Sequence, residues 1–379
     1  MRIIDTNLIN HQNIWCMKEN KKKLAFAAIN PFVTSNIILP TEEEARNKGF
    51  VTWGTDNKYP NYLWDLYLNC ATLQSIINGT ADFIVGNDVI CNARGFESTV
   101  NKKGESMIDI LRKIAIDKMI FGGYAIQVIR DMVGRVSEIY HLDFMKVRSN
   151  KENTVLYYAE DWTAWSVKAL KYPKYEVGDE NPNSIFYNKG NITRSVYPIP
   201  LYGAAILSCE TEKNINEFHL NNLHNGFMGN MIVNFNNGTP TDEVQEEIEM
   251  NINDKFSGYQ NAGRILISFN DSDANKTTVE RLDSDDFDEK YKSLAERTRE
   301  QIFCAFRANS VLFGLNYSSG FNKQEFNEAF KLYNRTVVRP IQIEIVDTFD
   351  KIFGMKGSIT ITPFSLTPDG KEDTEQNVE

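Results

Sequence analysis

The hydrophobic pattern in the last third of the chain predicts two long helices joined by a loop. Apolar residues repeat at helical spacing through residues 285–306, and again from Phe326 until Arg339-Pro340 interrupts the pattern. Between the two repeats lies ANSVLFGLNYSSGF, residues 308–321, with glycine and serine as punctuation. An apolar stripe on a charged helix indicates packing on one side. The apolar positions are Phe287, Tyr291, Leu294, Thr298, Ile302, then Phe326, Phe330, Tyr333 and Val337. The segment from Asp283 to Phe353 is therefore predicted to be a scaffold that positions a loop.

A helix and a small strand–helix–strand module are predicted immediately before this segment. The first helix follows Tyr202-Gly203 and runs to about His224. A strand at 231–235 precedes a helix with Thr241 as its N-cap, because a threonine hydroxyl can accept a bond from a first-turn amide. The apolar stripe of that helix is Val244, Ile248, Ile252 and Phe256. Strands are predicted at 264–269 and 277–282.

The first half of the chain has the pattern of a mixed α+β body. The predicted helices are a short acidic one in TEEEARNKG ending at Gly49, two apolar repeats before Gly86, and an amphipathic helix over 105–121 that Gly122-Gly123 ends. Residues 124–150 alternate as a hairpin with its turn near Met132 to Arg135. Further strands are predicted at 155–158, 162–167, 184–188 and 358–362. The acidic residues 367–379 are predicted to be disordered.

Composition narrows the class of protein. The chain has 379 residues, 42% hydrophobic, with a formal net charge of −10 and a pI of about 5.2. Proteins that bind DNA phosphates tightly are usually basic, but an acidic chain can still meet DNA where the polymer has to slide past, and composition alone does not separate that case from an ordinary soluble protein. No apolar run approaches the roughly 18 residues of a membrane span, and the N-terminus does not resemble a signal peptide. The five scattered cysteines form no CxxC pair, which argues against zinc or a disulfide framework.

No enzyme signature is present, and we expect no reaction, metal or cofactor. GxxxxGK[ST], GxSxG, HExxH and GxGxxG are all missing. The acidic cluster Asp283, Asp285, Asp286 and Asp288 could bind a divalent metal in a nucleic-acid enzyme. It stands at a predicted helix start, where carboxylates complement the helix dipole. Helix capping is the favoured interpretation, and the metal-dependent enzyme is the alternative.

The order of these elements resembles that of the portal proteins of tailed bacteriophages. The phrases that carry the resemblance are WGTDNKYPNYL, ADFIVGNDV, LYG (201–203), NAGRILISF (261–269), the helix 285–306 and SVLFGL (310–315). SVLFGL stands where many portals carry VPPxLLG, with Ser310-Val311 in place of the proline pair. The chain also stops soon after Thr362, so a crown domain is expected to be minimal or absent.

The resemblance implies a portal-type fold and a domain layout. An N-terminal arm (1–49) would precede an α/β wing (50–203), and two stem helices (204–225 and 284–307) would flank a strand–helix–strand clip (226–283). A tunnel-loop region (308–320) would lead into a long bent helix and strand of the inner wing (321–366), followed by the acidic tail (367–379).

The resemblance also implies function and partners. Family members form a ring of about twelve subunits at one capsid vertex, through which double-stranded DNA is packaged and ejected. The implied partners are the terminase large subunit as packaging motor, a head–tail adaptor and the major capsid protein, with no membrane. The implied location is the virion, assembled in the host cytoplasm; another head–tail adaptor is the remaining alternative. Lys290, Arg297, Asn316 and Lys323 are the predicted channel-facing residues.

Overall fold

The computed structural model describes residues 41–45, 48–164, 166–178, 181–190, 196–224, 231–235, 241, 243–244, 246–247, 265–269, 287–314 and 323–364, with backbone alone at 222–224, 231–235, 265–269, 287–290 and 323. The chain forms two compact units. The smaller comprises 1–34 and 216–288, and the larger comprises 35–215 and 289–379.

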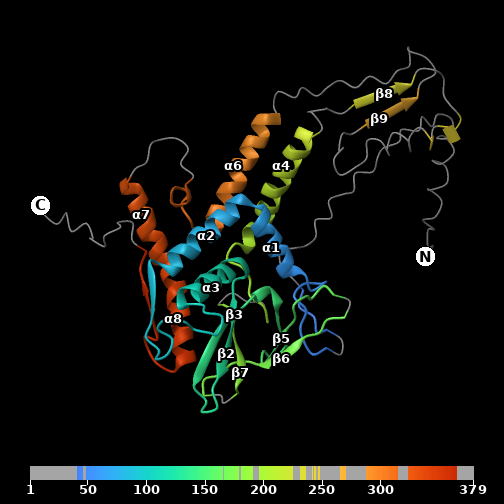
Figure 1. The fold of residues 1–379 in the computed structure, drawn as a ribbon. Helices are drawn as coiled ribbons and strands as arrows, with labels where there is room; N and C mark the ends of the chain where they lie inside the picture. The colour runs from blue at the N-terminus through green and yellow to red at the C-terminus, as the bar shows by residue number, and fades with distance from the viewer. Residues whose placement is uncertain are drawn as a thin grey trace, which may run out of the picture. The chain divides into compact units, whose positions relative to one another are not determined.

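The helices of the larger unit have clear local start and stop signals (Figure 1). They are α1 (Tyr59–Asn69), α2 (Ala71–Val85), α3 (Met107–Phe121), α7 (Lys323–Tyr333) and α8 (Arg339–Phe353), with most of α4 (Ile206–His224) and α6 (Phe287–Phe306). Ser106 and Asp109 form a capping box at the start of α3, and Gly122 ends the helix at φ 85°. The predicted helix 105–121 is thereby confirmed.

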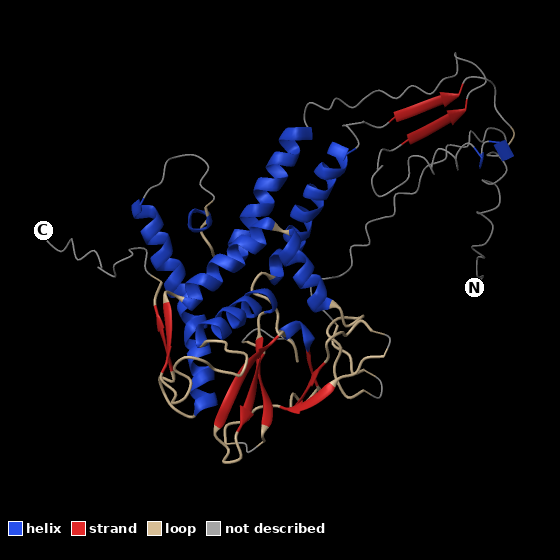
Figure 2. Ribbon diagram, in the orientation of Figure 1, coloured by secondary structure: helices blue, strands red, loops and turns tan. Residues whose placement is uncertain are grey.

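Two three-stranded sheets and a strand pair accompany these helices (Figure 2). The first sheet places β2 (Tyr124–Arg130) between β3 (Val136–Leu142) and β7 (Asn183–Asn188), all antiparallel. The second contains β4 (Val147–Ser149), β5 (Val155–Tyr158) and β6 (Leu170–Pro173), also antiparallel. The pair joins β1 (Asp88–Cys91) to β10 (Ile359–Thr362). The predicted hairpin and the predicted strands at 155–158, 184–188 and 358–362 are confirmed.

One hydrophobic core joins the helices to the central sheet. Ile114 of α3 and Ile126 of β2 are fully buried in it. Trp53 is also fully buried, and its ring stacks on Tyr197 with centroids 4.6 Å apart. Gly123 follows α3 where a Cβ would lie 2.4 Å from the Asn188 carbonyl oxygen. Only glycine allows β2 to begin this close to β7.

Two predictions in the larger unit were wrong. Residues 41–45 are extended instead of helical, because Glu43 accepts a bond from Thr52 N and Glu44 pairs with Val51. The residues described in 162–167 form no strand. Asp161 Oδ1 accepts from both Thr163 N and Thr163 Oγ1, which bends the chain locally.

The long helix changes its winding before the predicted break. α7 ends at Tyr333, a π-helical turn spans Asn334–Val338, and α8 begins at Arg339. Pro340 therefore lies in the first turn of α8, where its missing N–H costs little. The winding therefore changes at Asn334 instead of at Arg339-Pro340, since the Arg339 N–H bonds to Asn334 O across the wider turn.

A single carboxylate organises the turn between α8 and β10. Asp350 accepts hydrogen bonds from Gly357 N at 3.1 Å, Ser358 N at 2.8 Å and Ser358 Oγ at 2.7 Å. Burial acts to raise the pKa of Asp350, but the hydrogen bonds from Ser358 and Gly357 outweigh it and lower the pKa below its ordinary value.

This lowered pKa predicts a pH dependence. A depressed folded-state pKa stabilises the fold above the unfolded pKa, and this stabilisation is lost as the pH falls through the folded value. We expect Asp350→Asn to destabilise the protein by about 1 kcal/mol at pH near 7, because the amide cannot accept all three bonds equally well. The difference from wild type should shrink below about pH 4. Thermal unfolding at both pH values checks this; an unchanged difference would count against it.

The smaller unit contains a parallel strand pair. β8 (Met231–Phe235) and β9 (Ile265–Phe269) pair with Met231 opposite Ile265, as the predicted strands at these positions require. Residues 243–244 and 246–247 are helical, and the rest of the helix predicted after Thr241 lies outside the described residues. The strand predicted at 277–282 and the acidic segment 367–379 also lie outside them.

Across the described part of the chain, no helix has the length and apolar character needed to cross a bilayer.

Candidate functional site

The predicted channel-facing residues belong to α6, to α7 and to the segment between these two helices. Arg297 lies on α6, is exposed and has no ion pair with any described residue. Lys290 also lies on α6 and Lys323 begins α7, with both side chains outside the described set. Asn316 lies outside the described residues. The structure therefore places three of the four on the two helices that carry the loop.

α6 packs through its C-terminal half. Thr298 and Ile302 are buried as the hydrophobic pattern predicts, and Phe306 at the end of the helix is buried as well. Leu294 is 42% exposed, which corrects its assignment to the buried side. The apolar repeat also runs through the N-terminal half of α6, where the other described parts of the larger unit do not cover the helix. The repeat alone therefore could not show where packing ends.

The loop begins in a short, well-defined turn. A 3-10 helix, Ser310–Phe313, follows α6 and ends at Gly314 with φ 79°. Asn309 supplies its cap, because Asn309 Oδ1 accepts from Val311 N at 3.0 Å. The asparagine cap and the glycine stop shape a compact turn without the proline pair found at this place in many portals.

Phe313 anchors this turn to three helices. Its ring centroid lies 6.2 Å from Phe83 of α2, 6.0 Å from Phe303 of α6 and 5.9 Å from Tyr333 of α7. The hydroxyls of Tyr333 and Thr80 are hydrogen bonded at 2.7 Å. The turn that begins the loop is therefore held in one aromatic cluster, and residues 315–322 after it are not described. The sequence pattern identified these aromatics as helix repeats but not their convergence.

Gly79 leaves the space that Phe313 occupies. A Cβ at Gly79 would lie 2.8 Å from Phe313 Cε1, closer than van der Waals contact permits. We expect Gly79→Ala to displace the Phe313 ring and to increase protease cleavage in the 308–322 segment, with a loss of about 1–3 kcal/mol in unfolding free energy. Gly79→Ala combined with Phe313→Leu should restore protection. Limited proteolysis followed by mass spectrometry tests this; equal protection of wild type and single variant would contradict it.

The first half of α4 is bonded to α1, α2 and α6. Glu212 Oε1 accepts from Thr72 N at 3.1 Å in the first turn of α2. Lys213 Nζ donates to Asp65 Oδ2 of α1 at 2.6 Å. Ser208 Oγ donates to Gln301 Oε1 of α6 at 2.8 Å. These contacts, made from successive turns of α4, hold its first half to α1, α2 and α6.

A buried polar network holds α8 against the central sheet. Lys118 of α3 is 5% exposed, and its ammonium donates to Glu344 of α8 at 2.5 Å. Thr348, one turn further along α8, is hydrogen bonded to Tyr124 of β2 at 2.8 Å. Asn188 of β7 donates to the same tyrosine hydroxyl at 3.0 Å. The segment that carries the loop is thus tied to the wing by satisfied buried polar groups.

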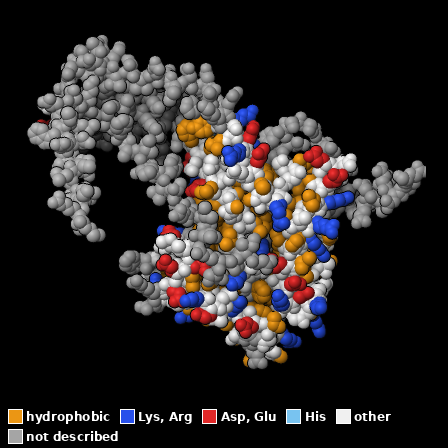
Figure 3. Space-filling model, turned by 180° about the vertical axis from the view of Figure 1, so that it is seen from behind, with side chains coloured by type: hydrophobic (Ala, Val, Ile, Leu, Met, Phe, Trp, Pro, Cys, Tyr) orange, Lys and Arg blue, Asp and Glu red, His pale blue; other side chains and the backbone are white. Residues whose placement is uncertain are grey.

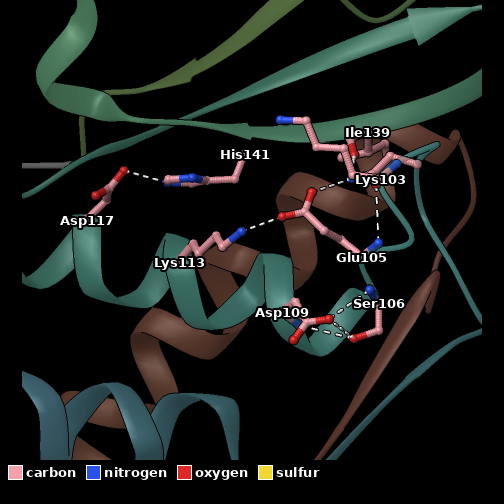
Figure 4. A network of polar contacts seen from close by, with 9 residues as sticks. Lys103, Glu105, Ser106, Asp109, Lys113, Asp117, Ile139 and His141 are labelled. Carbon is pink, nitrogen blue, oxygen red and sulfur yellow. Dashed lines mark hydrogen bonds and ion pairs between the residues drawn. The ribbon is translucent and has the colours of Figure 1, made fainter.

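A second buried pair joins α3 to β3 (Figure 4). Asp117 Oδ2 accepts from Phe144 N at 3.2 Å and lies 2.7 Å from His141 Nε2. Burial raises the pKa of Asp117, and the neighbouring His141 opposes that shift. Within the described residues no serine or cysteine is hydrogen bonded to His141, so a catalytic triad is not formed there. The pair fixes one helix to one strand.

The acidic cluster offers no described geometry for metal binding. Asp283, Asp285 and Asp286 lie outside the described residues, and Asp288 lies on α6 with its side chain outside them. Among the residues that the structure does describe, no group of three or more His, Cys, Asp or Glu side chains could hold a metal.

Comparison with known proteins agrees with this architecture. Residues 100–364, more than half of the chain, match the family model described as "Phage portal protein". A chain from the solved "Virion of native gene transfer agent (GTA) particle" is 14% identical with a TM-score of 0.53, covering 80% of this chain and 83% of that one. A chain from "Neck of native GTA particle computed with C12 symmetry" is 14% identical with a TM-score of 0.50, covering 81% and 85%. At this identity the likeness shows a shared fold. No curated protein sequence matches. On its sequence match and the fold described above, this chain belongs to the phage portal protein family.

Proposed function

We propose that the protein is the subunit of a portal ring at one capsid vertex, through which double-stranded DNA is packaged and ejected. The family match over residues 100–364 carries the proposal. The turn that follows α6 supports it, because Phe313 holds this turn against α2, α6 and α7, and a channel constriction must be held rigidly by its base while DNA moves past it. One similar fold occurs in a neck computed with C12 symmetry, which supports a ring of about twelve subunits.

The proposed layout follows the family. Residues 50–203 and 321–366 form the wing, 204–225 and 284–307 the stem, 226–283 the clip and 308–320 the tunnel-loop region. The clip would meet the terminase large subunit during packaging and a head–tail adaptor afterwards, and the wing would meet the major capsid protein. The protein would act in the virion after assembly in the host cytoplasm, as a structural component without a reaction of its own.

The charge of the chain suits a conduit. A net charge of −10 disfavours tight phosphate binding, which would arrest a moving polymer. A few basic or polar groups can centre the DNA electrostatically without holding it. We assign that role to Arg297, Lys290, Lys323 and Asn316, of which Arg297 is the one whose exposed side chain the structure describes.

Exposed apolar residues on α1 identify a surface for ring contacts. Trp64 and Leu68 are exposed one turn apart, beside the Asp65–Lys213 bridge to α4. Large apolar residues in adjacent exposed positions are typical of interfaces, and a ring requires each subunit to cover part of its neighbour.

Electron microscopy of the purified full chain tests the proposal. We expect closed rings of about twelve subunits, and a Trp64→Glu/Leu68→Glu variant should shift the population towards monomers. Asn61→Glu, at an exposed polar position of the same helix, is the control and should leave rings intact. A wild-type protein that stays monomeric at micromolar concentration would refute a ring.

Deleting Ser318 to Gly320 tests the assignment of the tunnel loop. Phe313 anchors the turn that begins the loop, so shortening the segment after this turn should leave ring assembly unchanged. We expect DNA packaging or retention in particles to fall at least tenfold, while ring yield stays near wild type. Packaged DNA per particle and ring yield by microscopy give the two measurements. Equal loss of both would argue against a channel loop.

A further inference from the structure

A row of basic side chains runs along the exposed side of α7 and α8. Lys331, Arg335 and Arg339 are exposed, and none has an ion pair among the residues that the structure describes. In a regular α-helix, residues four apart drift around the axis, because 3.6 residues make a turn. The π-helical turn Asn334–Val338 winds more widely and offsets that drift. The three cations therefore stay in line, and Figure 3 shows Lys and Arg side chains gathered on the side of the larger unit that carries α7 and α8.

Apolar side chains flank the basic row. Leu332 is 66% exposed and Ile343 is 49% exposed on the same two helices. Pro340 is exposed between them. A mixed basic and apolar strip of this kind binds an acidic peptide segment well, since the cations pair with carboxylates and the flanking residues cover its apolar atoms.

The described chain ends beside this row. Phe364 packs on Phe330 of α7, with ring centroids 6.0 Å apart, and on Phe83 at 5.1 Å. Phe330 immediately precedes Lys331. The next fifteen residues carry one lysine and a set of carboxylates: Asp369, Glu372, Asp373, Glu375 and Glu379.

The lengths match. Eight residues separate Phe364 from Glu372, and an extended chain spans up to about 3.4 Å per residue, or roughly 27 Å. The row from Lys331 to Arg339 covers eight helical steps of about 1.5 Å, or roughly 12 Å. The carboxylates can therefore reach every cation of the row without any movement of Phe364.

We propose that residues 369–379 of this chain bind along the basic row formed by Lys331, Arg335 and Arg339. The acidic segment acts as a cover that keeps other polyanions, such as DNA, from this side of α7 and α8. Carboxylate–guanidinium pairs at Arg335 and Arg339 supply the specificity, because a planar guanidinium can donate two parallel hydrogen bonds to one carboxylate. The inference does not depend on ring formation.

Zero-length crosslinking of the full chain tests the contact. A carbodiimide activates a carboxyl group, and the Lys331 amine displaces the activating group to form an amide, with the carbodiimide leaving as a urea. We expect peptides that join Lys331 to Glu372, Asp373 or Glu375, at a yield several times that of the exposed lysines Lys168 and Lys171. The yield should fall strongly at about 1 M salt, where the Debye length is about 3 Å.

Charge variants decide between specific and random crosslinking. Arg335→Glu/Arg339→Glu should abolish the Lys331 crosslinks, whereas Lys168→Glu/Lys171→Glu should leave them unchanged. Mixing isotope-labelled and unlabelled chains shows whether the segment binds its own chain, as proposed; crosslinks found only between a labelled and an unlabelled chain would overturn binding within one chain. Crosslinks spread evenly over Lys168, Lys171 and Lys331 would overturn it.

DNA binding supplies a second readout. The variant Asp369→Asn/Glu372→Gln/Asp373→Asn/Glu375→Gln should bind a short DNA duplex roughly tenfold more tightly than wild type at low salt. Adding Arg335→Gln/Arg339→Gln should remove that gain. If the neutralised segment leaves affinity unchanged while Arg335→Gln/Arg339→Gln lowers it, DNA itself occupies the row and the proposal is wrong.

Discussion

Replacing Arg148 with methionine is expected to lower the free energy of unfolding by about 4 kcal/mol. The Arg148 side chain is fully buried and no carboxylate is bonded to it among the described residues. Its guanidinium donates to Asn57 Oδ1 at 2.6 Å and Asn57 O at 2.9 Å, and to Met145 O at 2.8 Å and Val147 O at 2.9 Å. Methionine fills much of the volume but removes all four of these bonds. Asn57 Oδ1 still accepts from Trp53 N at 3.0 Å, whereas the three buried carbonyl oxygens each lose a donor, which costs desolvation.

The charge of Arg148 persists at neutral pH. Burial lowers the pKa of Arg148 to about 10, which still leaves the group protonated. The guanidinium also lies over the rings of Trp162, at 5.0 Å, and Trp53, at 5.7 Å, so two aromatic faces replace part of its hydration. One side chain thereby ties the turn at residue 57 to the start of β4.

Urea denaturation of three variants measures this effect. Arg148→Lys should have intermediate stability, because an ammonium keeps the charge but cannot reproduce the fork of donors. Arg94→Met, at an exposed position of the same unit, should change stability by no more than about 0.5 kcal/mol. If Arg148→Met lies within that same margin of wild type, the buried hydrogen bonds do not contribute as argued.

Replacing Glu344 with glutamine is expected to cost about 3 kcal/mol, because it leaves a buried ammonium without its counter-ion. The side chain of Lys118 is 7% exposed and that of its partner Glu344 is 24% exposed. Lys118 also lies 6.0 Å over the Tyr124 ring, and it has Gly190 beside it, so the ammonium has little access to water. The uncompensated charge should loosen α8 from α3.

A double-mutant cycle separates the pair from its surroundings. Lys118→Met/Glu344→Leu should recover most of the stability that Glu344→Gln loses, because apolar replacement of a whole buried pair is often neutral. Asp347→Asn, an exposed position on α8, serves as the control. Additive losses from the two members of the pair would show that they do not interact. Hydrogen exchange of α8 gives an independent measurement of its attachment to the wing.

Local signals in the sequence predicted most of the elements. Gly86 and Gly122 end α2 and α3 with positive φ, and the alternation in 124–142 identifies the β2–β3 hairpin. These features depend on neighbouring residues, so they can be read without the fold. The same reasoning failed at 41–45, where acidic residues favour a helix in isolation but pair instead with Val51 and Thr52. Tertiary hydrogen bonds there outweigh a weak helical propensity.

The candidate site was predictable only in outline. Two helical repeats on either side of a Gly/Ser-rich segment predicted the loop and the two helices that flank it. SVLFGL, directly after the first helix, marks where the loop begins. The pattern could not show that Phe313 packs against Gly79, more than 230 positions earlier. The pattern also placed Leu294 on the packed side of α6, but no other described part of the larger unit covers this residue. Periodicity reports which side of a helix is apolar, but not how far the partner surface extends.

The sequence by itself determined the helices from 206 to 224 and 287 to 306, the order of elements and the family, because these depend on periodicity, capping and local phrases. Only the tertiary structure decided which residues pack around Phe313 and which buried polar groups pair with one another. The Lys118–Glu344 pair spans 226 positions, and the contacts of Arg148 with Asn57 span 91. Buried polar groups need partners wherever the chain brings them, and folding selects those partners by geometry and not by distance along the sequence.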